Sequence, residues 1–305
     1  MEFDMNAANI AMLEGNVAAA RPLADMFSVQ GKTAIVTGGT SGLGFNIVLR
    51  LLQGGANVVI AGSSEAKGAY TLPVLEKAGF GADRVVFCRT NVTCDEDMQN
   101  LVRTADEKFG SIDIFVNSAA VWSYAHVYDL SSAEFRRVME TNVIGAFLGV
   151  KYVSQYMIEH GIAGKITLIS SNCAWMPYPV FGGYPHYAAS KGAVNSFVIE
   201  SAKELKRFGI MVNAVAPGGM VTAGSSGNMC AKDLDEDKAD EFYDELMVWQ
   251  IDEVPPVDTV AIVAYAMCTP MSDGMTGEVV VADGGSSHNI FRRQVEIEAY
   301  PPEDE

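Results

Sequence analysis

Residues 33–53 contain the feature that most limits how this chain can fold. The β-branched run at 33–37 leads into the glycine-rich segment TGGTSGLG at 37–44, and a helical pattern then continues to about Gln53. Glycines let the backbone turn sharply and approach a pyrophosphate, whose charge the N–H groups at a helix N-terminus can meet. This order of strand, turn and helix therefore indicates a dinucleotide site, although alone it also suits a plain strand-to-helix turn.

The rest of the chain continues this alternation of strands and helices. Six further apolar runs predict strands, at 57–61, 85–88, 112–117, 165–170, 211–216 and 278–282. Helical patterns separate or follow them, near 64–78, 95–109, 131–160 and 187–208. Strands that are apolar on both faces and alternate with helices form parallel sheets that are covered on both sides. We therefore predict an α/β fold: a single doubly wound Rossmann-type domain with a parallel seven-stranded sheet and helices on both faces.

Three segments depart from this pattern. Residues 1–25 form an N-terminal extension with apolar residues at helical spacing, so we expect a short helix that packs on the domain or on a neighbouring subunit. Within the dinucleotide-binding and catalytic domain, which we place at 26–290, residues 219–256 carry eight acids between Asp233 and Glu245, followed by a Met- and Trp-containing stretch, and predict a substrate lid. Residues 291–305 form a C-terminal tail.

The charge balance limits the partners of the chain. Its 305 residues include 21 Lys and Arg against 38 Asp and Glu, a net charge of −17. A field of this sign opposes nucleic acids and anionic membrane surfaces, so we expect neither as a partner. The N-terminus has the wrong polarity for a signal peptide, and no apolar run approaches the roughly 18 residues of a membrane-spanning helix. We expect a cytoplasmic protein without membrane insertion.

The cysteines and histidines point to no metal site. The five cysteines are an odd, scattered set without CxxC spacing, which favours reduced thiols over disulfides or zinc. The four histidines show no ligand spacing either. His186 lies beside the motif described below, but we expect the adjacent helical position to point elsewhere.

Several motifs together resemble the short-chain dehydrogenase/reductase family over about residues 26–287. The loop glycines follow that family's TGxxxGxG form, and the segment at 113–120 is similar to its strand ending in NNAG, with Ser118 and Ala120 as departures. The remaining similar elements are Asn91-Val92, the NVIGAF segment at 142–147, Pro217-Gly218-x3-Thr222, Thr276-Gly277 and the DGG segment at 283–285. The resemblance implies the fold already predicted and an NAD(P)-dependent oxidoreductase.

The resemblance also implies which residues hold the cofactor. They are Gly38, Thr40, Ser41, Gly42, Leu43, Gly44, Ser63, Ser64, Asn91, Val92, Asn117, Ala119, Tyr187, Lys191, Pro217, Gly218 and Thr222. An acid at the end of the second strand would bind the adenosine ribose and select NAD. Gly62-Ser63-Ser64 follows that strand without an acid, which slightly favours NADP over NAD, although neither Ser41 nor Ser63 is a basic residue.

A tyrosine and a lysine form the catalytic candidate. Tyr187 and Lys191 stand four residues apart, on one face of a helix. A phenol has a pKa near 10, and a nearby ammonium and a positive nicotinamide would favour phenolate. The resemblance implies that Tyr187 is the acid/base of hydride transfer between a secondary alcohol and a ketone, beside Ser171, with Ser170 as the adjacent alternative. It also implies that Asn142 binds a water linking Lys191 to solvent.

The loops predict a large apolar substrate. Aromatic residues and methionines gather there, at Trp122, Tyr124, Tyr128, Trp175, Met176, Tyr178, Phe181, Tyr184, Met220, Met229, Met247 and Trp249. Such content suits a steroid or bile-acid hydroxyl, as in a hydroxysteroid dehydrogenase-like member. The alternatives are a small carbonyl, sugar or acyl substrate, an epimerase or dehydratase, and a non-catalytic NAD(P)-sensing regulator. We expect a homotetramer or homodimer.

Overall fold

A seven-stranded parallel sheet forms the centre of the molecule. The computed structural model describes residues 5–176, 183–220, 222 and 256–288. The strands lie in the order β3-β2-β1-β4-β5-β6-β7, and every pair of neighbours is parallel. Their bounds are β1 (Thr33–Thr37), β2 (Asn57–Gly62), β3 (Val85–Arg89), β4 (Ile114–Asn117), β5 (Lys165–Ile169), β6 (Met211–Pro217) and β7 (Val279–Ala282). The predicted fold class and all seven strands are confirmed.

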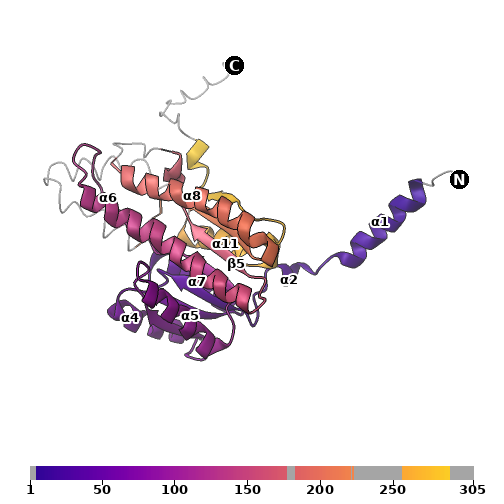
Figure 1. Ribbon diagram of the computed structural model, residues 1–305. Helices are drawn as coiled ribbons and strands as arrows, with labels where there is room; N and C mark the ends of the chain where they lie inside the picture. Colours follow the sequence, from indigo (N-terminus) through magenta and orange to yellow (C-terminus); the bar gives the residue numbers. More distant parts are fainter. Residues whose placement is uncertain (1–4, 177–182, 221, 223–255, 289–305) are drawn as a thin grey trace, which may run out of the picture.

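Helices cover both faces of the sheet (Figure 1). The helices after the loop are α3 (Gly42–Gln53), α4 (Glu65–Lys77), α5 (Asp95–Phe109), α6 (Ser132–Met139), α7 (Gly145–Glu159), α8 (Pro185–Leu205) and α11 (Val257–Met267). Side chains alternate along each strand, so Ile35 and Phe115 pack beneath α5, α7 and α8. Val36 and Val116 point the other way and pack against α3 and α11. Burial on both faces explains why the strands are continuously apolar.

The order of the strands places a site at one edge of the sheet. The order reverses between β1 and β4, since β2 lies on one side of β1 and β4 on the other. In doubly wound sheets, ligands bind in the crevice outside the carboxyl ends of the strands at such a switch point. The Thr37 hydroxyl donates to Asn117 Oδ1 at 2.9 Å and joins the ends of β1 and β4. The glycine-rich loop starts from this point.

Two helical regions differ from the predicted pattern. The helix expected at 131–160 is divided by a π-helical turn, Glu140–Ile144, whose hydrogen-bond register is one residue longer than that of an α-helix. Helix α11 was not among the predicted elements, because it is apolar nearly all round and gives no amphipathic signal. It packs on α3, where the Tyr265 ring touches the position that a Cβ of Gly54 would occupy.

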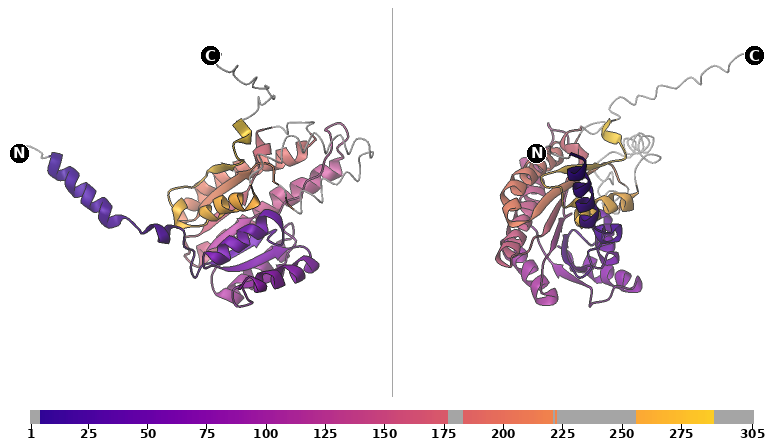
Figure 2. Two further views of the ribbon diagram at one scale, coloured as in Figure 1. Left: turned by 180° about the vertical axis from the view of Figure 1, so that it is seen from behind. Right: turned by 90° about the vertical axis from the view of Figure 1, so that its right-hand side faces the viewer.

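The N-terminal helix α1 (Met5–Ala19) stands away from the domain (Figures 1 and 2). Its described side chains, residues 9–19, are exposed, including Ile10, Leu13 and Val17. The chain joins the domain after it: α2 (Leu23–Met26) follows an ion pair of Arg21 with Asp273 at 3.0 Å. The predicted helix is therefore present, and within the described part of the chain it does not pack on the domain.

Candidate active site

The glycine-rich loop forms a tight cradle at the switch point. Gly38 and Gly42 have φ values of +67° and +55°, which favour glycine. A Cβ on Gly44 would lie 2.3 Å from the Gly38 carbonyl oxygen, and one on Gly38 would lie 2.8 Å from the Ala119 nitrogen. Ser41 precedes α3 without capping it through its side chain, so the N–H groups of the first turn face the loop. This arrangement suits a pyrophosphate, because glycines let the backbone approach the ligand and the N–H groups at the start of α3 can meet its charge.

The other loop residues named from the resemblance lie around this cradle. Thr40 and Leu43 are buried. The Thr222 side chain lies 3.4 Å from the position of a Gly42 Cβ, so the segment after β6 reaches the cradle. Pro217 ends β6, and a Cβ on Gly218 would lie 2.8 Å from the Asp283 Cβ.

The end of β2 is where the sequence predicts contact with an adenosine ribose. Gly62 ends the strand without an acid, and Ser63 after it is exposed. Ser64 has a structural task, because its hydroxyl oxygen accepts the N–H of Lys67 at 3.3 Å and caps α4. Only its O–H proton remains as a donor toward a ligand.

The residues after β3 and β4 are held by hydrogen bonds. Asn91 Oδ1 accepts the N–H of Thr93 at 3.2 Å and its hydroxyl at 3.0 Å, and Val92 beside it is buried. Ala119 donates its N–H to the Thr37 hydroxyl at 3.2 Å, which places it beside Asn117. The four predicted residues, Asn91, Val92, Asn117 and Ala119, therefore lie at or beyond the carboxyl ends of β3 and β4. This is the same edge of the sheet as the glycine cradle.

Tyr187, Lys191 and Ser171 come together beyond the carboxyl end of β5. Tyr187 and Lys191 stand on the first turns of α8, and the Lys191 ammonium lies 5.5 Å from the centre of the Tyr187 ring. Lys191 Nζ donates to the Ile169 carbonyl at 2.7 Å. The Ser171 side chain lies near enough to the Tyr187 phenol to lower its pKa. The adjacent Ser170 is buried and donates to Asn195 Oδ1 at 2.6 Å, so the geometry favours Ser171.

Burial decides the charge states in this cluster. It raises the pKa of the Tyr187 phenol, an effect that the Cys173 thiol adds to and the Ser171 hydrogen bond opposes. Burial also lowers the pKa of Lys191 to about 8. The sequence predicts that the lysine together with a bound nicotinamide favours phenolate; this stays a prediction, and burial of the phenol opposes it. The Lys191 ammonium is directed to the Ile169 carbonyl, and burial is the largest influence on the pKa of each group.

The Asn142 side chain has a structural task in addition to the predicted one. It lies in the π-helical turn, where its side chain accepts the N–H of Val121 at 2.8 Å and donates to the Val121 carbonyl at 2.9 Å. It also donates to the Ser190 hydroxyl at 3.0 Å. The amide thus joins the loop after β4 to α8, and the predicted water relay at this residue stays a prediction.

Three residues near Tyr187 are more closely involved than the sequence indicated. The Trp122 ring lies 6.1 Å from the Tyr187 ring at an angle of 59°. Cys173 donates its N–H to the Ser171 hydroxyl at 3.2 Å. His186 is fully buried and contacts Ser123. No sequence motif marks these three positions. The lengths of the loops between the strand ends and the following helices are the only sequence signal near them.

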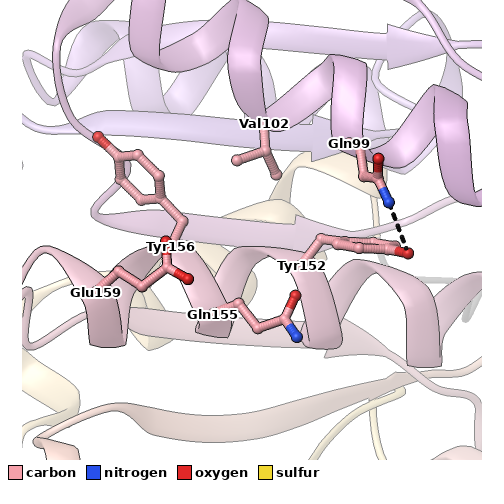
Figure 3. A pocket seen from close by; sticks show the side chains of 6 residues that line it. All are labelled: Gln99, Val102, Tyr152, Gln155, Tyr156 and Glu159. Atoms are coloured by element: carbon pink, nitrogen blue, oxygen red, sulfur yellow. Dashed lines mark hydrogen bonds between the residues drawn. The ribbon is translucent and has the colours of Figure 1, made fainter.

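Other features of the described residues do not compete with this cluster. A groove of about 180 Å³ lies between α5 and α7, lined by Gln99, Val102, Tyr152, Gln155, Tyr156 and Glu159 (Figure 3). It shares no residue with the cluster. The described ranges contain no group of three or more potential metal ligands. No helix within them has the length and apolarity needed to cross a membrane.

Comparisons with known proteins agree with this geometry. The family model of short chain dehydrogenases matches residues 32–230. (+)-Borneol dehydrogenase 2 of Salvia officinalis is 35% identical over 216 residues, covering 70% of this chain and 73% of the relative. Glucose 1-dehydrogenase 2 of Bacillus subtilis (strain 168) is 31% identical over 273 residues, covering 87% and 98%. The crystal structure of levodione reductase superposes with a TM-score of 0.75 at 28% identity, covering 85% of this chain and 98% of that one.

Proposed function

Because the chain belongs to the short-chain dehydrogenase/reductase family of NAD(P)-dependent oxidoreductases, we propose that it interconverts a secondary alcohol and a ketone. The observation that carries the proposal is the meeting of Ser171, Tyr187 and Lys191 next to the glycine cradle. A phenol, a hydroxyl and an ammonium in one buried cluster can hold a carbonyl oxygen and exchange a proton with it.

Each residue has a distinct task in this proposal. When bound, NAD(P) supplies hydride acceptance or donation at the nicotinamide. Tyr187 takes the proton of the substrate hydroxyl during oxidation and returns it during reduction. Ser171 holds the substrate oxygen beside that phenol. Lys191 places a positive charge near the phenol, and Asn142 fixes the loop and helix that carry the cluster.

The substrate class is a bulky apolar secondary alcohol, of which a steroid or bile-acid hydroxyl is our specific proposal. Rings gather near Tyr187: Trp122 against it, and Tyr124 edge-on to Tyr184 with centroids 5.7 Å apart. A (+)-borneol dehydrogenase among the relatives supports an apolar alcohol, while a glucose 1-dehydrogenase supports the alternative of a small polar one. Most of the proposed lid at 219–256 lies outside the described residues, as do Tyr178, Phe181, Met229, Met247 and Trp249.

NADP is our proposed cofactor in preference to NAD. The support is the open end of β2, where Gly62 and Ser63 offer no carboxylate to repel a 2′-phosphate. Thr40 is the neighbour of a Gly62 Cβ, at 3.3 Å, and it carries no charge.

We also propose a homodimer or homotetramer in the cytoplasm. Four apolar side chains on α7, α8 and the turn after α8 are exposed, namely Phe147, Ile158, Ile199 and Phe208. Contact with a second copy of the chain would remove such side chains from water. The described cysteines, namely Cys88, Cys94, Cys173 and Cys268, are free thiols, which fits a reducing compartment.

A panel of substrates tests the function directly. Purified protein is assayed for formation or consumption of reduced nicotinamide with NAD and NADP, against secondary alcohols and ketones from small polyols to steroids and bile acids. Turnover of a ring-shaped apolar alcohol supports the proposal, and turnover of sugars alone moves the substrate class to the alternative. If neither nucleotide supports turnover of any member but both bind, the NAD(P)-sensing regulator replaces the enzyme.

A further inference from the structure

A chain of polar contacts joins α6 to the start of the catalytic helix. Arg137 donates to Glu134 through two nitrogens, at 2.7 and 2.6 Å. The Ser123 hydroxyl donates to the same carboxylate of Glu134. Ser123 Oγ also lies 3.0 Å from Nε2 of His186, the residue just before Tyr187. The contacts thus cross three elements: α6, the loop after β4 and α8.

The direction of each hydrogen bond follows from the charge on Glu134. The Arg137 guanidinium lowers the pKa of this carboxyl to about 2, so Glu134 is ionised and can only accept. Ser123 has one hydroxyl proton, and it is given to Glu134. The Ser123 oxygen must then accept from the histidine, so Nε2 of His186 carries a proton.

The other ring nitrogen indicates that His186 is neutral. His186 is fully buried, and its Nδ1 has no hydrogen-bond partner within the described residues. Protonation at Nδ1 would bury a charged N–H without an acceptor, which is costly. The charged groups whose fields reach the ring are Glu134 and Arg137, both from α6; they act in opposite directions, and burial lowers the pKa of His186.

The loop after β4 and the start of α8 also meet at a second, neighbouring contact. Trp122 precedes Ser123 in the loop, and Tyr187 follows His186 in the helix, so the Trp122–Tyr187 ring contact lies beside the Ser123–His186 hydrogen bond. Asn142 holds Val121, the residue before Trp122, through both backbone groups. Three consecutive loop residues are therefore fixed against the helix that carries the phenol.

We propose that His186 is a positioning residue: as a neutral Nε2–H donor to Ser123, it fixes the loop after β4 on α8 and so holds Trp122 against Tyr187. The effect of His186 on turnover rests on the proposed role of Tyr187. The tautomer of His186 is independent of that role, and it can be measured without any substrate.

Nitrogen-15 NMR of histidine-labelled protein tests the tautomer. The chain has only four histidines, and His186→Gln identifies the signal by its loss. At pH 7 the wild-type ring should give the neutral Nε2–H pattern, and Ser123→Ala should shift that signal. His160→Gln is the control, because His160 lies at the end of α7 and its ring is hydrogen-bonded to the Tyr156 carbonyl, outside this network. An Nδ1–H tautomer or an imidazolium at pH 7 overturns the proposal, whether or not the protein is an enzyme.

Kinetics then test the positioning role. A glutamine amide can replace the Nε2–H donor, so His186→Gln should keep most of kcat, whereas His186→Leu should lower it by roughly 10- to 100-fold, as expected for a displacement near the reacting group. Ser123→Ala should lower kcat to a similar extent, and the double variant His186→Leu/Ser123→Ala should be no worse than either, since one link is lost. A His186→Leu protein that melts earlier but keeps the wild-type kcat overturns the role.

Discussion

Replacement of Gly44 by alanine should weaken nucleotide binding through a defined collision. A Cβ there would lie 2.3 Å from the Gly38 carbonyl oxygen, whereas ordinary contacts begin at 3.4 Å. The difference, 3.4 − 2.3, requires a shift of 1.1 Å. The colliding atom belongs to the backbone, so the loop itself has to move and no side chain can rotate away.

The expected magnitude follows from this displacement. Overpacking of this kind costs about 1–3 kcal/mol. If the strain falls on the nucleotide-binding form of the loop, the Kd for NADP(H) rises by roughly 5- to 150-fold, since 1.4 kcal/mol is tenfold. Titration of the reduced nucleotide by its fluorescence measures this change, and thermal unfolding of the free protein reports how much strain the apo form carries.

Gly192→Ala is the matched control. Gly192 lies in α8 beside Lys191, and its Cβ would meet only the Ala174 carbonyl oxygen at 3.9 Å. Alanine in a helix interior stabilises by up to about 1 kcal/mol over glycine, so this variant should bind nucleotide normally and melt no earlier. Wild-type affinity together with wild-type stability in Gly44→Ala, with a normal control, would refute the predicted collision in the loop.

Three further changes test other parts of the site. Gly62→Asp should shift kcat/KM toward NAD, because a carboxylate at the end of β2 repels a 2′-phosphate and accepts from ribose hydroxyls; an unchanged ratio would place the ribose elsewhere. Lys191→Met should remove a pH dependence of stability. The folded pKa of Lys191, about 8, lies below its unfolded value of 10.5, so between these two pH values the unfolded chain binds more protons than the folded one. The stability of the wild type therefore rises with pH across this window by about 3 kcal/mol. Urea unfolding of both proteins at each end of the window measures this, and an equal rise in Lys191→Met would refute it. Trp122→Ala should raise KM for a bulky apolar alcohol more than for a small one, and equal effects on both would mean that the ring does not contact substrate.

The sequence predicts the architecture well because its signals are local. The strand at 33–37 and the helix at 42–53 are found with the predicted bounds, since buried β-branched runs and glycine turns leave little choice. The missed helix α11 is apolar nearly all round, so no periodicity distinguishes it. Asn142 in the π-helical turn binds Val121 and Ser190, and pairing over this distance is not visible in a linear pattern.

The candidate site is predicted in part for the same reason. The resemblance names Ser171, Tyr187 and Lys191, and the fold brings them together. The charge states were not predictable, because the pKa of Tyr187 depends on burial that only the packed structure defines. The link from His186 to Ser123 joins two loop-and-helix segments 63 residues apart in the chain.

Tyr187→Phe tests the central claim most directly. Phenylalanine keeps the ring beside Trp122 and Lys191 and removes only the hydroxyl that is proposed to exchange the proton. Turnover of the best substrate should fall by roughly 10²- to 10⁴-fold, the usual contribution of general acid–base catalysis, while the affinity for NADP(H) stays nearly unchanged. A variant with near-wild-type turnover and normal nucleotide affinity would contradict the assignment of Tyr187 as the acid/base of this enzyme.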